Sequence, residues 1–476
     1  MKHLLGIDVG TTSLKGCVFD EKGNEIASVT KAYTLITEGE FVEFPAEKYF
    51  DLFKEAYAEL SSKVRIDAFS IDTQGETIVF LDSDGKPLMN AIVWLDNRAK
   101  SEADEIEKRF GMKRVYEVTG QTEVSPGFPA PKILWLKKNR PDLFKKLDKI
   151  LLLEDYLLFR ITGRFVCDRA LYSSSLVLDI VSGKYWSEML DFIGISEKLL
   201  PELKESGVKI GEYKGADVST GTLDQVAGFI GCGIINEGSV SEMTGTCLAV
   251  CASTNRIPPY FEGIKVPVHY VSKGKYCLLM WAPTAGMALE WLKKNFFFDV
   301  SFIELDALAE KIPFGSEGLV FAPNMCGSVM PEKDSSLKGG IYGIELKHTR
   351  AHFARALMES VACLLRQYIE YINIPVKEII SIGGGAKSKL WLQIKADVTG
   401  KKMLTLKNSE TGCLGSAILA GVGTGVYADI ENAVENTVEY VSCTERKAEK
   451  HEADNLYGKF IELNRVFSNR GQSLKG

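Results

Sequence analysis

The first third of the chain alternates between short apolar runs and segments with helical periodicity. Apolar runs at Lys2–Val9, Lys15–Asp20 and Glu25–Lys31 predict three strands joined by polar turns. Apolar residues three and four positions apart predict a helix over Ala46–Leu60. The same patterns predict strands at Ala68–Asp72 and Thr77–Leu81, helices at Ser101–Phe110, Lys132–Lys138, Asp142–Leu147 and Ile150–Thr162, and the end of a short helix at Lys198–Leu203.

A second series of strands and helices begins near Gly238. Its order of strand, turn, strand, strand, helix and strand partly repeats the order at the start, which indicates two related α/β halves. Because small ligands usually bind in clefts between domains, we expect the site between the halves. The second series comprises strands at Val240–Ser253, Lys275–Leu279, Gly318–Pro323, Glu378–Ile382 and Lys402–Leu406, and helices at Ala285–Lys294, His348–Tyr371, Ser388–Val398 and Cys413–Thr424.

Length and composition narrow the class of protein. The 476 residues exceed what one core organises, and the 45% hydrophobic and 25% charged residues are typical of a globular protein of two domains. A net charge of −6 argues against a nucleic-acid partner, and no apolar run reaches membrane-spanning length. The chain starts directly with a strand, and its ten cysteines lie mostly in apolar segments without zinc-ligand spacing. These features predict a cytoplasmic protein with reduced thiols, no signal peptide and no membrane partner.

The first two predicted strands meet at a polar turn that suits a phosphate group. The first apolar run ends in Asp8, and the turn Gly10-Thr11-Thr12 follows before the second run begins. Gly10 lets the backbone approach a ligand closely, and the two threonines supply N–H and O–H donors for phosphate oxygens. Asp8 is suited to hold Mg²⁺ through water. The alternative is an ordinary β-hairpin with glycine and threonine at its turn.

Two polar segments in the first half suit a sugar or a polyol. The segment Asp72–Thr77 lies at the end of one predicted strand, and Trp94–Arg98 lies shortly after the next one. Carboxylates and amides form hydrogen bonds with hydroxyl groups, and an indole ring covers the C–H face of a sugar. The alternative is a polar turn and a buried tryptophan beside an ion pair.

Asp224 is a candidate general base near the middle of the chain. It precedes a run of small residues, Ala227 to Gly233, that predicts a tightly packed helix. In an active site, a carboxylate at this place can take the proton of a substrate hydroxyl. The alternative is a helix N-cap, the usual role of an aspartate at a helix start.

Two further glycine turns lie in the second half of the chain. The segment Glu242–Thr246 joins a strand to a Gly-Thr turn, as the first hairpin does, and suggests a second phosphate site facing the first. The segment Ser381–Ser388 leads from a strand through three glycines into a helix, whose N-terminus favours an anion or a nucleotide. Its spacing matches neither GxxxxGK[ST] nor GxGxxG, and the alternative is a lone glycine-rich turn.

Taken in order, these segments resemble the FGGY carbohydrate kinases of the actin/Hsp70/sugar-kinase superfamily, from about residue 3 to residue 427. Gly6–Thr12 resembles the first phosphate loop of that family, Gly245-Thr246 the second, and Ser381–Ala386 the adenosine loop. The resemblance implies a two-domain α/β fold with ribonuclease H-like domains and a cleft between them. The first domain, residues 1–240, would hold the sugar and the first phosphate loop, and the second, residues 241–476, would hold the nucleotide.

The resemblance also implies roles for particular residues, with ATP and Mg²⁺ as the cofactors. Asp224 falls where the family has its catalytic base. Substrate-binding residues are implied at Gln74, Gly75, Glu76, Thr77, Trp94, Asp96, Phe128, Asp224 and Gln225. Nucleotide-binding residues are implied at Gly10, Thr11, Thr12, Lys15, Gly245, Thr246, Gly286, Gly384, Gly385, Ala386 and Ser388, and metal-binding residues at Asp8 and Asp224.

The implied activity is ATP-dependent phosphorylation of a terminal hydroxyl of a small sugar or polyol. The runs Asn90–Arg98 and Pro126–Lys132 are most similar to the xylulose kinase branch of the family, which implies conversion of D-xylulose to D-xylulose 5-phosphate. Gly75-Glu76 departs from the Met-His pair typical of that branch and from the Arg-Glu pair of glycerol kinases, so glycerol, erythritol, ribulose and autoinducer-2 are alternative substrates. A non-catalytic sugar sensor and an actin- or Hsp70-like ATPase are the rival classes. Because members of the family often dimerise, the resemblance allows a homodimer.

Overall fold

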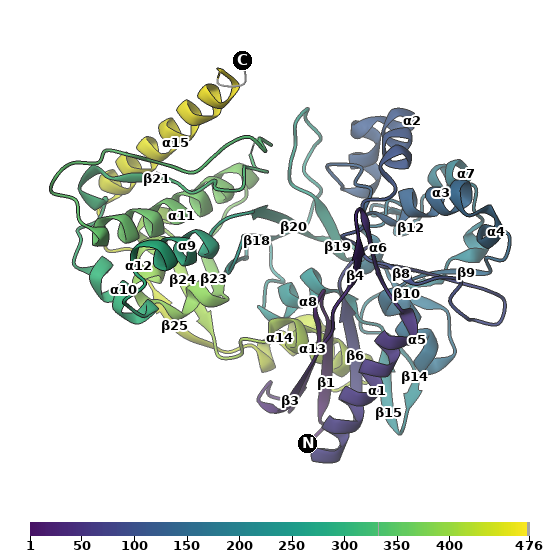
Figure 1. The fold of residues 1–476 in the computed structure, drawn as a ribbon. Helices are drawn as coiled ribbons and strands as arrows, with labels where there is room; N and C mark the ends of the chain where they lie inside the picture. The colour runs from purple at the N-terminus through teal and green to yellow at the C-terminus, as the bar shows by residue number, and fades with distance from the viewer. Residues whose placement is uncertain (332, 474–476) are drawn as a thin grey trace.

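Two seven-stranded sheets form the centres of the two halves of the molecule (Figure 1). The structure is a computed structural model that describes residues 1–331 and 333–473. The strands of the first sheet are β1 (Leu4–Val9), β2 (Ser13–Phe19), β3 (Glu25–Ala32), β6 (Ala68–Thr73), β14 (Lys209–Tyr213), β15 (Ala216–Ser219) and β16 (Thr222–Leu223). Their order is β14-β15-β6-β1-β2-β3, with β16 also beside β6. Strand β1 is antiparallel to β2 and parallel to β6, so the carboxyl ends of β1 and β6 lie at one edge.

Different cores cover the two faces of this first sheet. Helix α1 (Ala46–Lys63) has Tyr49, Phe53 and Leu60 on one buried stripe, as its periodicity predicts. Along β1, Leu5 and other odd-numbered residues join the core under α1, whereas Leu4 joins the opposite core, the alternation expected of a strand.

A smaller five-stranded sheet and several helices complete the first half. The sheet has the order β4-β5-β8-β7-β9 and consists of β4 (Ile36–Glu38), β5 (Phe41–Phe44), β8 (Ala91–Ile92), β7 (Ile78–Leu81) and β9 (Lys149–Leu152). The helices are α2 (Lys100–Thr119), α3 (Pro129–Asn139), α4 (Pro141–Phe144), α5 (Leu153–Thr162), α6 (Arg169–Tyr172) and α7 (Ser187–Ile193), and short strands form at β10 (Val166–Asp168), β11 (Leu178–Asp179), β12 (Lys184–Tyr185) and β13 (Glu202–Lys204).

Three predicted helices of this region differ from the structure. The single helix predicted over Ile150–Thr162 is wrong, because its first residues pair with β7 as strand β9 and the helix begins only at Leu153. The helix predicted to end at Phe110 continues to Thr119 past a break in helical geometry at Gly111. Near residue 198 the chain forms a single 3₁₀ turn, Glu197–Leu199, and then strand β13.

The second sheet repeats the arrangement of the first, as the sequence predicts. Its strands are β17 (Val240–Thr244), β18 (Leu248–Thr254), β19 (Val268–Ser272), β20 (Lys275–Ala282), β23 (Glu378–Ile382), β24 (Lys402–Leu406) and β25 (Tyr440–Thr444). Their order is β19-β20-β18-β17-β23-β24-β25. Here β17 and β18 are antiparallel and β23 is parallel to β17, as β1, β2 and β6 are in the first sheet. The strand predicted over Val240–Ser253 is therefore a hairpin that turns at 245–247.

The helices of the second half are α9 (Gly286–Phe296), α10 (Phe302–Glu310), α11 (Arg350–Ile372), α12 (Lys389–Thr399), α13 (Thr411–Gly423), α14 (Ile430–Thr437) and α15 (Lys450–Ser473), and β21 (Val320–Ala322) pairs with β22 (Gly340–Tyr342). Helices α9, α11, α12 and α13 lie where the sequence predicts them. Elements β19, α10, β22, α14, β25 and α15 are not among those predicted from the sequence. Within the described residues, no helix is long and apolar enough to cross a membrane.

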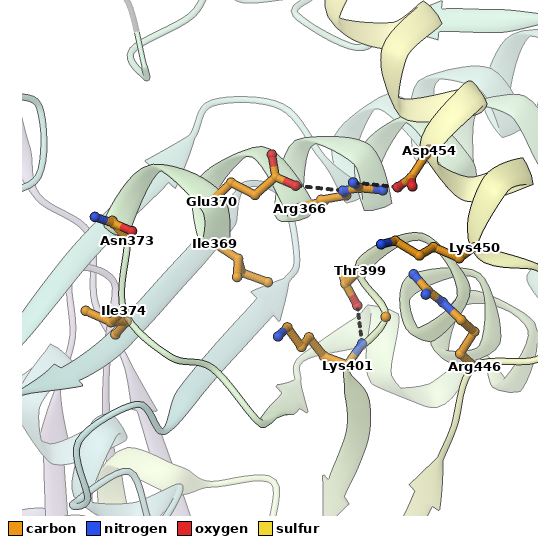
Figure 2. Close-up of a pocket in the computed structure, with 11 residues that line it drawn as sticks. Arg366, Ile369, Glu370, Asn373, Ile374, Thr399, Lys401, Arg446, Lys450 and Asp454 are labelled. Carbon is orange, nitrogen blue, oxygen red and sulfur yellow. Dashed lines mark hydrogen bonds and ion pairs between the residues drawn. The ribbon is translucent and has the colours of Figure 1, made fainter.

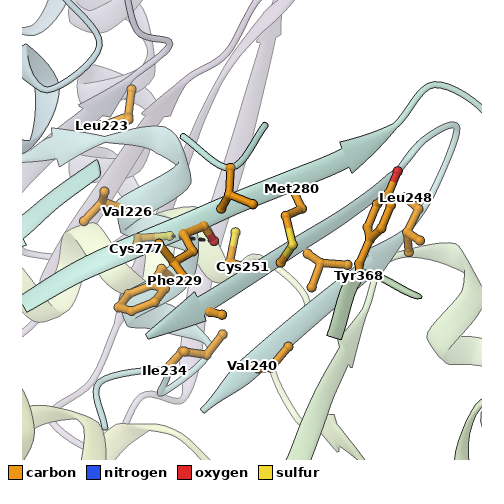
Figure 3. Close-up of a cluster of buried hydrophobic side chains, with 14 of the residues drawn as sticks. Leu223, Val226, Phe229, Ile234, Val240, Leu248, Cys251, Cys277, Met280 and Tyr368 are labelled. Carbon is orange, nitrogen blue, oxygen red and sulfur yellow. Dashed lines mark hydrogen bonds between the residues drawn. The ribbon is translucent and has the colours of Figure 1, made fainter. Parts of the chain in front are cut away.

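Helix α8 (Asp224–Gly231) crosses α13 between the two halves of the molecule (Figure 1). A Cβ atom at Gly231 would lie 1.9 Å from the carbonyl oxygen of Thr411, and one at Gly415 would lie 1.9 Å from that of Ala227. The helix backbones therefore touch, which only glycine permits. Helix α13 also packs on β1 and β6 of the first sheet. Val226 and Phe229 of α8 belong instead to the apolar cluster on the second sheet (Figure 3).

Candidate active site

Three carboxylates meet where β1 and β6 end and α8 begins. The register places Asp8 beside Asp72 and Asp72 beside Thr222, two residues before Asp224. Asp72 is completely buried. One of its oxygens, Oδ2, accepts a hydrogen bond from Ser416 Oγ at 2.6 Å, and Oδ1 has no partner among the described residues. Asp72 was not predicted to be part of this group, although it ends a predicted strand.

Burial makes the negative form of these three groups unfavourable. It raises the pKa of Asp224 to about 8, with the nearby charges of Asp8 and Glu76 adding to the effect. Burial and Asp8 likewise raise the pKa of Asp72 well above its usual range. Burial also raises the pKa of Asp8, and the cation of Lys15 opposes that rise. A site that gathers acids in this way favours a cation and provides a carboxylate able to accept a proton near neutral pH.

Asp224 does not cap its helix. It is the first helical residue of α8, after Leu223 at the N-cap position, and its Oδ1 accepts only the N–H of Gln225, at 2.6 Å. The N-cap alternative from the sequence is therefore wrong. The carboxylate opens instead into a cavity of about 240 Å³ whose walls include Asp8, Gly10 and Gln225 from the first half of the chain. Met243 and Thr411 line the same cavity from the second half.

The first phosphate-type turn contacts the predicted sugar segment. Thr11 Oγ1 accepts a hydrogen bond from the indole N–H of Trp94 at 3.0 Å, and the Gly10 N–H donates to the Ser13 carbonyl at 3.0 Å. Thr12 is exposed at the tip. The Lys15 ammonium pairs with Glu410 of the second half at 2.9 Å. The first hairpin therefore contacts a predicted sugar residue through Thr11 and the second half of the chain through Lys15.

The predicted nucleotide loops gather at one edge of the second sheet. Gly286 packs so closely on Gly245 that a Cβ atom would lie 2.2 Å from the Gly245 carbonyl oxygen, and the Thr246 carbonyl accepts N–H groups at the start of α9. The 3₁₀ turn Gly384–Lys387, which contains Gly385 and Ala386, follows β23. Ser388 caps α12 by accepting the N–H of Trp391 at 3.0 Å.

A buried polar network that was not predicted from the sequence lies under these loops. Lys395 donates to Glu242 Oε1 at 2.7 Å and to Thr244 Oγ1 at 2.9 Å, and both charged side chains are completely buried. Ser381 donates to the same carboxylate of Glu242. The network joins β17, β23 and α12, and so fixes the second phosphate-type turn relative to the 3₁₀ turn.

A second cavity, of about 530 Å³, lies beside the first turn and is lined from both halves. Of the residues predicted to bind substrate, it contains Glu76, Trp94 and Phe128. The other polar residues of its wall were not predicted, among them Gln121, His269, Lys265 and Lys333. Burial lowers the pKa of His269 to about 4, so this imidazole is neutral at pH 7.

Four predicted substrate residues lie behind this cavity. Gln74 donates to the hydroxyl of Tyr49 at 3.2 Å, and Thr77 accepts the backbone N–H of Trp94 at 3.3 Å. A Cβ atom at Gly75 would lie 2.8 Å from a methyl group of Leu223, so a larger residue has little room.

The fourth of these residues, Asp96, holds an ion pair. Its carboxylate is buried and binds the Arg98 guanidinium at 2.7–2.8 Å and the Val42 N–H at 2.6 Å. The structure therefore places Asp96 in the ion pair that the alternative interpretation predicted, and no oxygen of this carboxylate remains for a sugar hydroxyl.

Comparison with known proteins agrees with this geometry. The model of the N-terminal domain of the FGGY family of carbohydrate kinases matches residues 3–234, and the model of its C-terminal domain matches residues 243–424. The chain belongs to the FGGY family of carbohydrate kinases. It is 32% identical to a xylulose kinase from Bacillus subtilis (strain 168) over 94% of both chains.

Solved structures of a xylulose kinase and a gluconate kinase have the same two-domain α/β fold. The ligand-bound xylulose kinase from Lactobacillus acidophilus aligns with a TM-score of 0.90 at 25% identity, covering 100% of both chains. A gluconate kinase from the same organism aligns with a TM-score of 0.89 at 26% identity, covering 98% of both chains. The predicted fold class is confirmed, and this chain is a sugar kinase that takes a nucleotide as phosphate donor.

The acids of this FGGY kinase fit a magnesium ion that keeps most of its water. Among the described residues, no group of three or more His, Cys, Asp or Glu side chains is arranged to enclose a metal ion. Mg²⁺ does not need such a cage, because it usually binds one or two carboxylates, several waters and the phosphates of a substrate. Asp8 and Asp224, with the unpartnered Oδ1 of Asp72 behind them, provide this donor set.

Another cavity of the kinase, about 420 Å³ in volume, lies away from these residues (Figure 2). Arg366 pairs there with Glu370 and Asp454, both at 2.8 Å, and Lys401 donates to a backbone carbonyl. None of the predicted site residues lines it. The predicted residues Asp8, Asp224, Glu76 and Trp94 line the two cavities described above.

Proposed function

We propose that the chain is a xylulose kinase, which transfers the γ-phosphoryl group of ATP to the terminal hydroxyl of D-xylulose and forms D-xylulose 5-phosphate. The surroundings of Asp224 are the main support for this proposal. The carboxylate of Asp224, whose pKa burial and the nearby charges of Asp8 and Glu76 raise, opens into a cavity that Gly10 of the first phosphate-type turn also lines. A hydroxyl placed there would have a proton acceptor beside a turn suited to phosphate oxygens.

In this proposal the sugar-side cavity binds the ketose. Glu76 accepts hydrogen bonds from hydroxyl groups, and the exposed face of the Trp94 indole covers the C–H face of the sugar. Phe128 closes the apolar side of the cavity, and Gln225 lies beside Asp224 at the reacting end. Gln74, Gly75, Thr77 and Asp96 keep these residues in place from behind.

The nucleotide would lie across the loops of the second half. The N–H groups of Thr11 and Thr12 and that of Thr246 are suited to the phosphates from two sides, while Gly10 and Gly245, whose own N–H groups bond within their turns, let the phosphates approach the backbone. The adenosine end would contact Gly286, Gly384, Gly385, Ala386 and Ser388, and Lys15 adds positive charge near the phosphates. Asp8 and Asp224 would hold Mg²⁺ through water, and the ion supplies charge that offsets the phosphate oxygens when it is bound.

The chemical step then needs little beyond positioning and one carboxylate. Phosphoryl transfer proceeds through a loose transition state, so the residues mainly align the hydroxyl with the phosphorus and neutralise charge. Asp224 accepts the proton of the attacking hydroxyl as the new O–P bond forms and the bond to the leaving diphosphate breaks. Its raised pKa suits a group that must gain a proton and later release it near neutral pH.

The departures at residues 75 and 76 bear on the choice of sugar. A glycerol kinase-like arginine at position 75 would project into Leu223 and Ser174, whose side chains would lie 2.8 and 3.0 Å from its Cβ atom. The methionine typical of the xylulose kinase branch would meet the same crowding, so the proposed sugar rests on the similarity of the whole chain. The overall similarity to the Bacillus subtilis xylulose kinase supports D-xylulose as the first substrate to test.

The test is a coupled ADP-release assay with Mg-ATP and a panel of acceptors. The panel contains D-xylulose, D-ribulose, L-ribulose, L-xylulose, glycerol, erythritol, gluconate and the autoinducer-2 precursor, and Mg-ATP without acceptor is the control. We expect the highest kcat/KM with D-xylulose. A higher value for another acceptor would replace D-xylulose as the substrate, and slow hydrolysis that no acceptor accelerates would contradict the proposed function.

A further inference from the structure

Lys132 is a buried cation that the activity outlined above does not use. Among the lysines that the structure describes, only Lys132 and Lys395 are buried, and both are completely inaccessible to solvent. Lys132 lies in the first turn of α3, behind the wall of the sugar-side cavity. Its ammonium donates to the backbone carbonyl of Glu76 at 2.9 Å and to that of Val93 at 3.0 Å.

These two carbonyls belong to the two segments that shape the sugar-side cavity. Glu76 projects into the cavity from the turn after β6, and Val93 directly precedes Trp94. One further bond joins the segments, from the Trp94 N–H to Thr77 Oγ1 at 3.3 Å. The two hydrogen bonds of Lys132 are shorter than this bond, and they come from a charged group. Lys132 therefore links the segments of Glu76 and Trp94, the two cavity residues that contact the sugar in the proposed function.

The backbone at Glu76 is held in an unusual conformation. Its φ of 58° lies in the left-handed region, which residues other than glycine rarely adopt. Such a conformation persists only where the surrounding structure fixes it. The bond from Lys132 to the Glu76 carbonyl is a direct constraint of this kind.

The charges around Lys132 single out Glu76 as its partner. Burial lowers the pKa of Lys132 to about 7, while Glu76 and Asp96 oppose that change and Arg98 adds to it. Asp96 is already neutralised by Arg98 at 2.7 Å. The Glu76 carboxylate, whose pKa burial raises and Lys132 lowers, is thus the group that the buried ammonium compensates.

We propose that Lys132 is a positioning residue for the sugar: it fixes Glu76 and Trp94 relative to each other through their backbones and keeps the Glu76 carboxylate ready to accept hydrogen bonds. The inference rests on the proposed function, because it assigns the cavity to the sugar. The predicted nucleotide contacts lie in other loops, and the connection to them is the hydrogen bond from the Trp94 indole to Thr11. The effect of losing Lys132 is therefore expected to be much larger on sugar binding than on ATP binding.

The test compares Lys132→Met, which keeps the length of the side chain and removes its donors, with Lys132→Gln, which keeps an N–H donor. Lys138→Met, on the same helix but with an exposed side chain paired to Glu105, is the matched control. KM values for sugar and ATP are measured with the strongest acceptor of the panel. Binding of that sugar without nucleotide is measured by isothermal titration calorimetry.

We expect Lys132→Met to raise the sugar KM and Kd about 10- to 100-fold, the size seen when a group that orients a ligand-binding residue is lost. The ATP KM is expected to stay within about twofold, Lys132→Gln to recover part of the loss, and Lys138→Met to match the wild type. An equal rise of both KM values, or a loss of thermal stability with normal sugar binding, would overturn the inference. If Lys132→Met does not fold, Lys132→Gln against Lys138→Met makes the same comparison.

The choice of sugar keeps this test separate from the proposed function. A strongest acceptor other than D-xylulose would correct the proposed substrate and leave the comparison at Lys132 intact. Absence of any accelerating acceptor would contradict the proposed function itself. In that case calorimetry with the wild type decides whether the cavity binds a sugar, and no binding would refute the role of Lys132 as well.

Discussion

Replacing Asp224 by asparagine tests the chemical role and the electrostatic cost of one carboxylate together. The substitution keeps the shape of the side chain and its hydrogen bond from the Gln225 N–H, because the amide oxygen can accept it. It removes the proton acceptor, so kcat in the ADP-release assay is expected to fall by at least ~10²-fold, the size of a general-base contribution. A variant that retains more than about a tenth of the wild-type kcat would remove Asp224 from that role.

The same substitution is expected to stabilise the protein without ligands. The pKa of Asp224 is about 8 in the folded chain against an ordinary value of 3.8, so the native state binds the proton more tightly than the unfolded state. The contribution of Asp224 to the free energy of unfolding is fully present below pH 4 and is lost as the pH rises towards 8. At pH 7 the free energy of unfolding would be lower by about 4 kcal/mol if the group were fully desolvated. Because Asp224 is partly accessible, we expect a decrease of about 1–4 kcal/mol.

Thermal melts of both proteins at pH 5, 6, 7 and 8 measure this cost. The asparagine variant should melt at a higher temperature, and the gap between the two proteins should widen from pH 5 to pH 8. A gap that is independent of pH, or a variant that melts lower than the wild type, would refute the electrostatic argument. Unchanged binding of ADP without Mg²⁺, measured by calorimetry, is the control that separates lost chemistry from a damaged site.

Three further substitutions test the packing and the networks around the site. Gly415→Ala should lower the stability by about 1–3 kcal/mol in thermal or urea unfolding, because its Cβ atom would overlap a carbonyl oxygen of α8; an unchanged melting temperature would show that the helices can separate at no cost. Lys395→Met should lower the free energy of unfolding by about 3–5 kcal/mol, because it leaves the Glu242 carboxylate buried without its cation. Urea unfolding measures this change, and the double variant with Glu242→Gln should recover most of it. Trp94→Phe keeps an aromatic face for the sugar and removes the hydrogen bond to Thr11, so the ATP KM should rise more than the sugar KM; the opposite order would mean that the indole serves the sugar alone.

The sequence predicted those elements whose pattern is local. The strands around Asp8 and the helix over Ala46–Leu60 have clear periodicity and clear turns, and the structure places them within a few residues. The strand at Ile150–Leu152 was not predicted because three consecutive apolar residues carry no period that separates a strand from a helix. Helix α15 could have been predicted, since Leu456, Phe460 and Leu463 recur at helical spacing.

The site was predictable where a residue's role follows from its place at the end of a strand. Asp8 and Asp224 have such places, and the structure brings them to one cavity. The bond from the Val42 N–H to Asp96 and the bonds of the buried Lys132 join segments distant in the chain, so no local pattern separates these side chains from exposed charges. His269 and Gln121 reach the sugar-side cavity only through the packing of the two halves.

The crossing of α8 and α13 has a consequence for how the chain acquires its structure. Each of the two predicted domains uses a helix that belongs to the other: α13 covers β1 and β6, and α8 completes the apolar cluster on the second sheet (Figure 3). A fragment ending at residue 240 would expose the sheet face that α13 covers, and a fragment beginning at residue 241 would lack α8. During synthesis, the first sheet therefore remains incompletely covered until Gly423 has left the ribosome, so an apolar face of the first half stays exposed while most of the second half is being made.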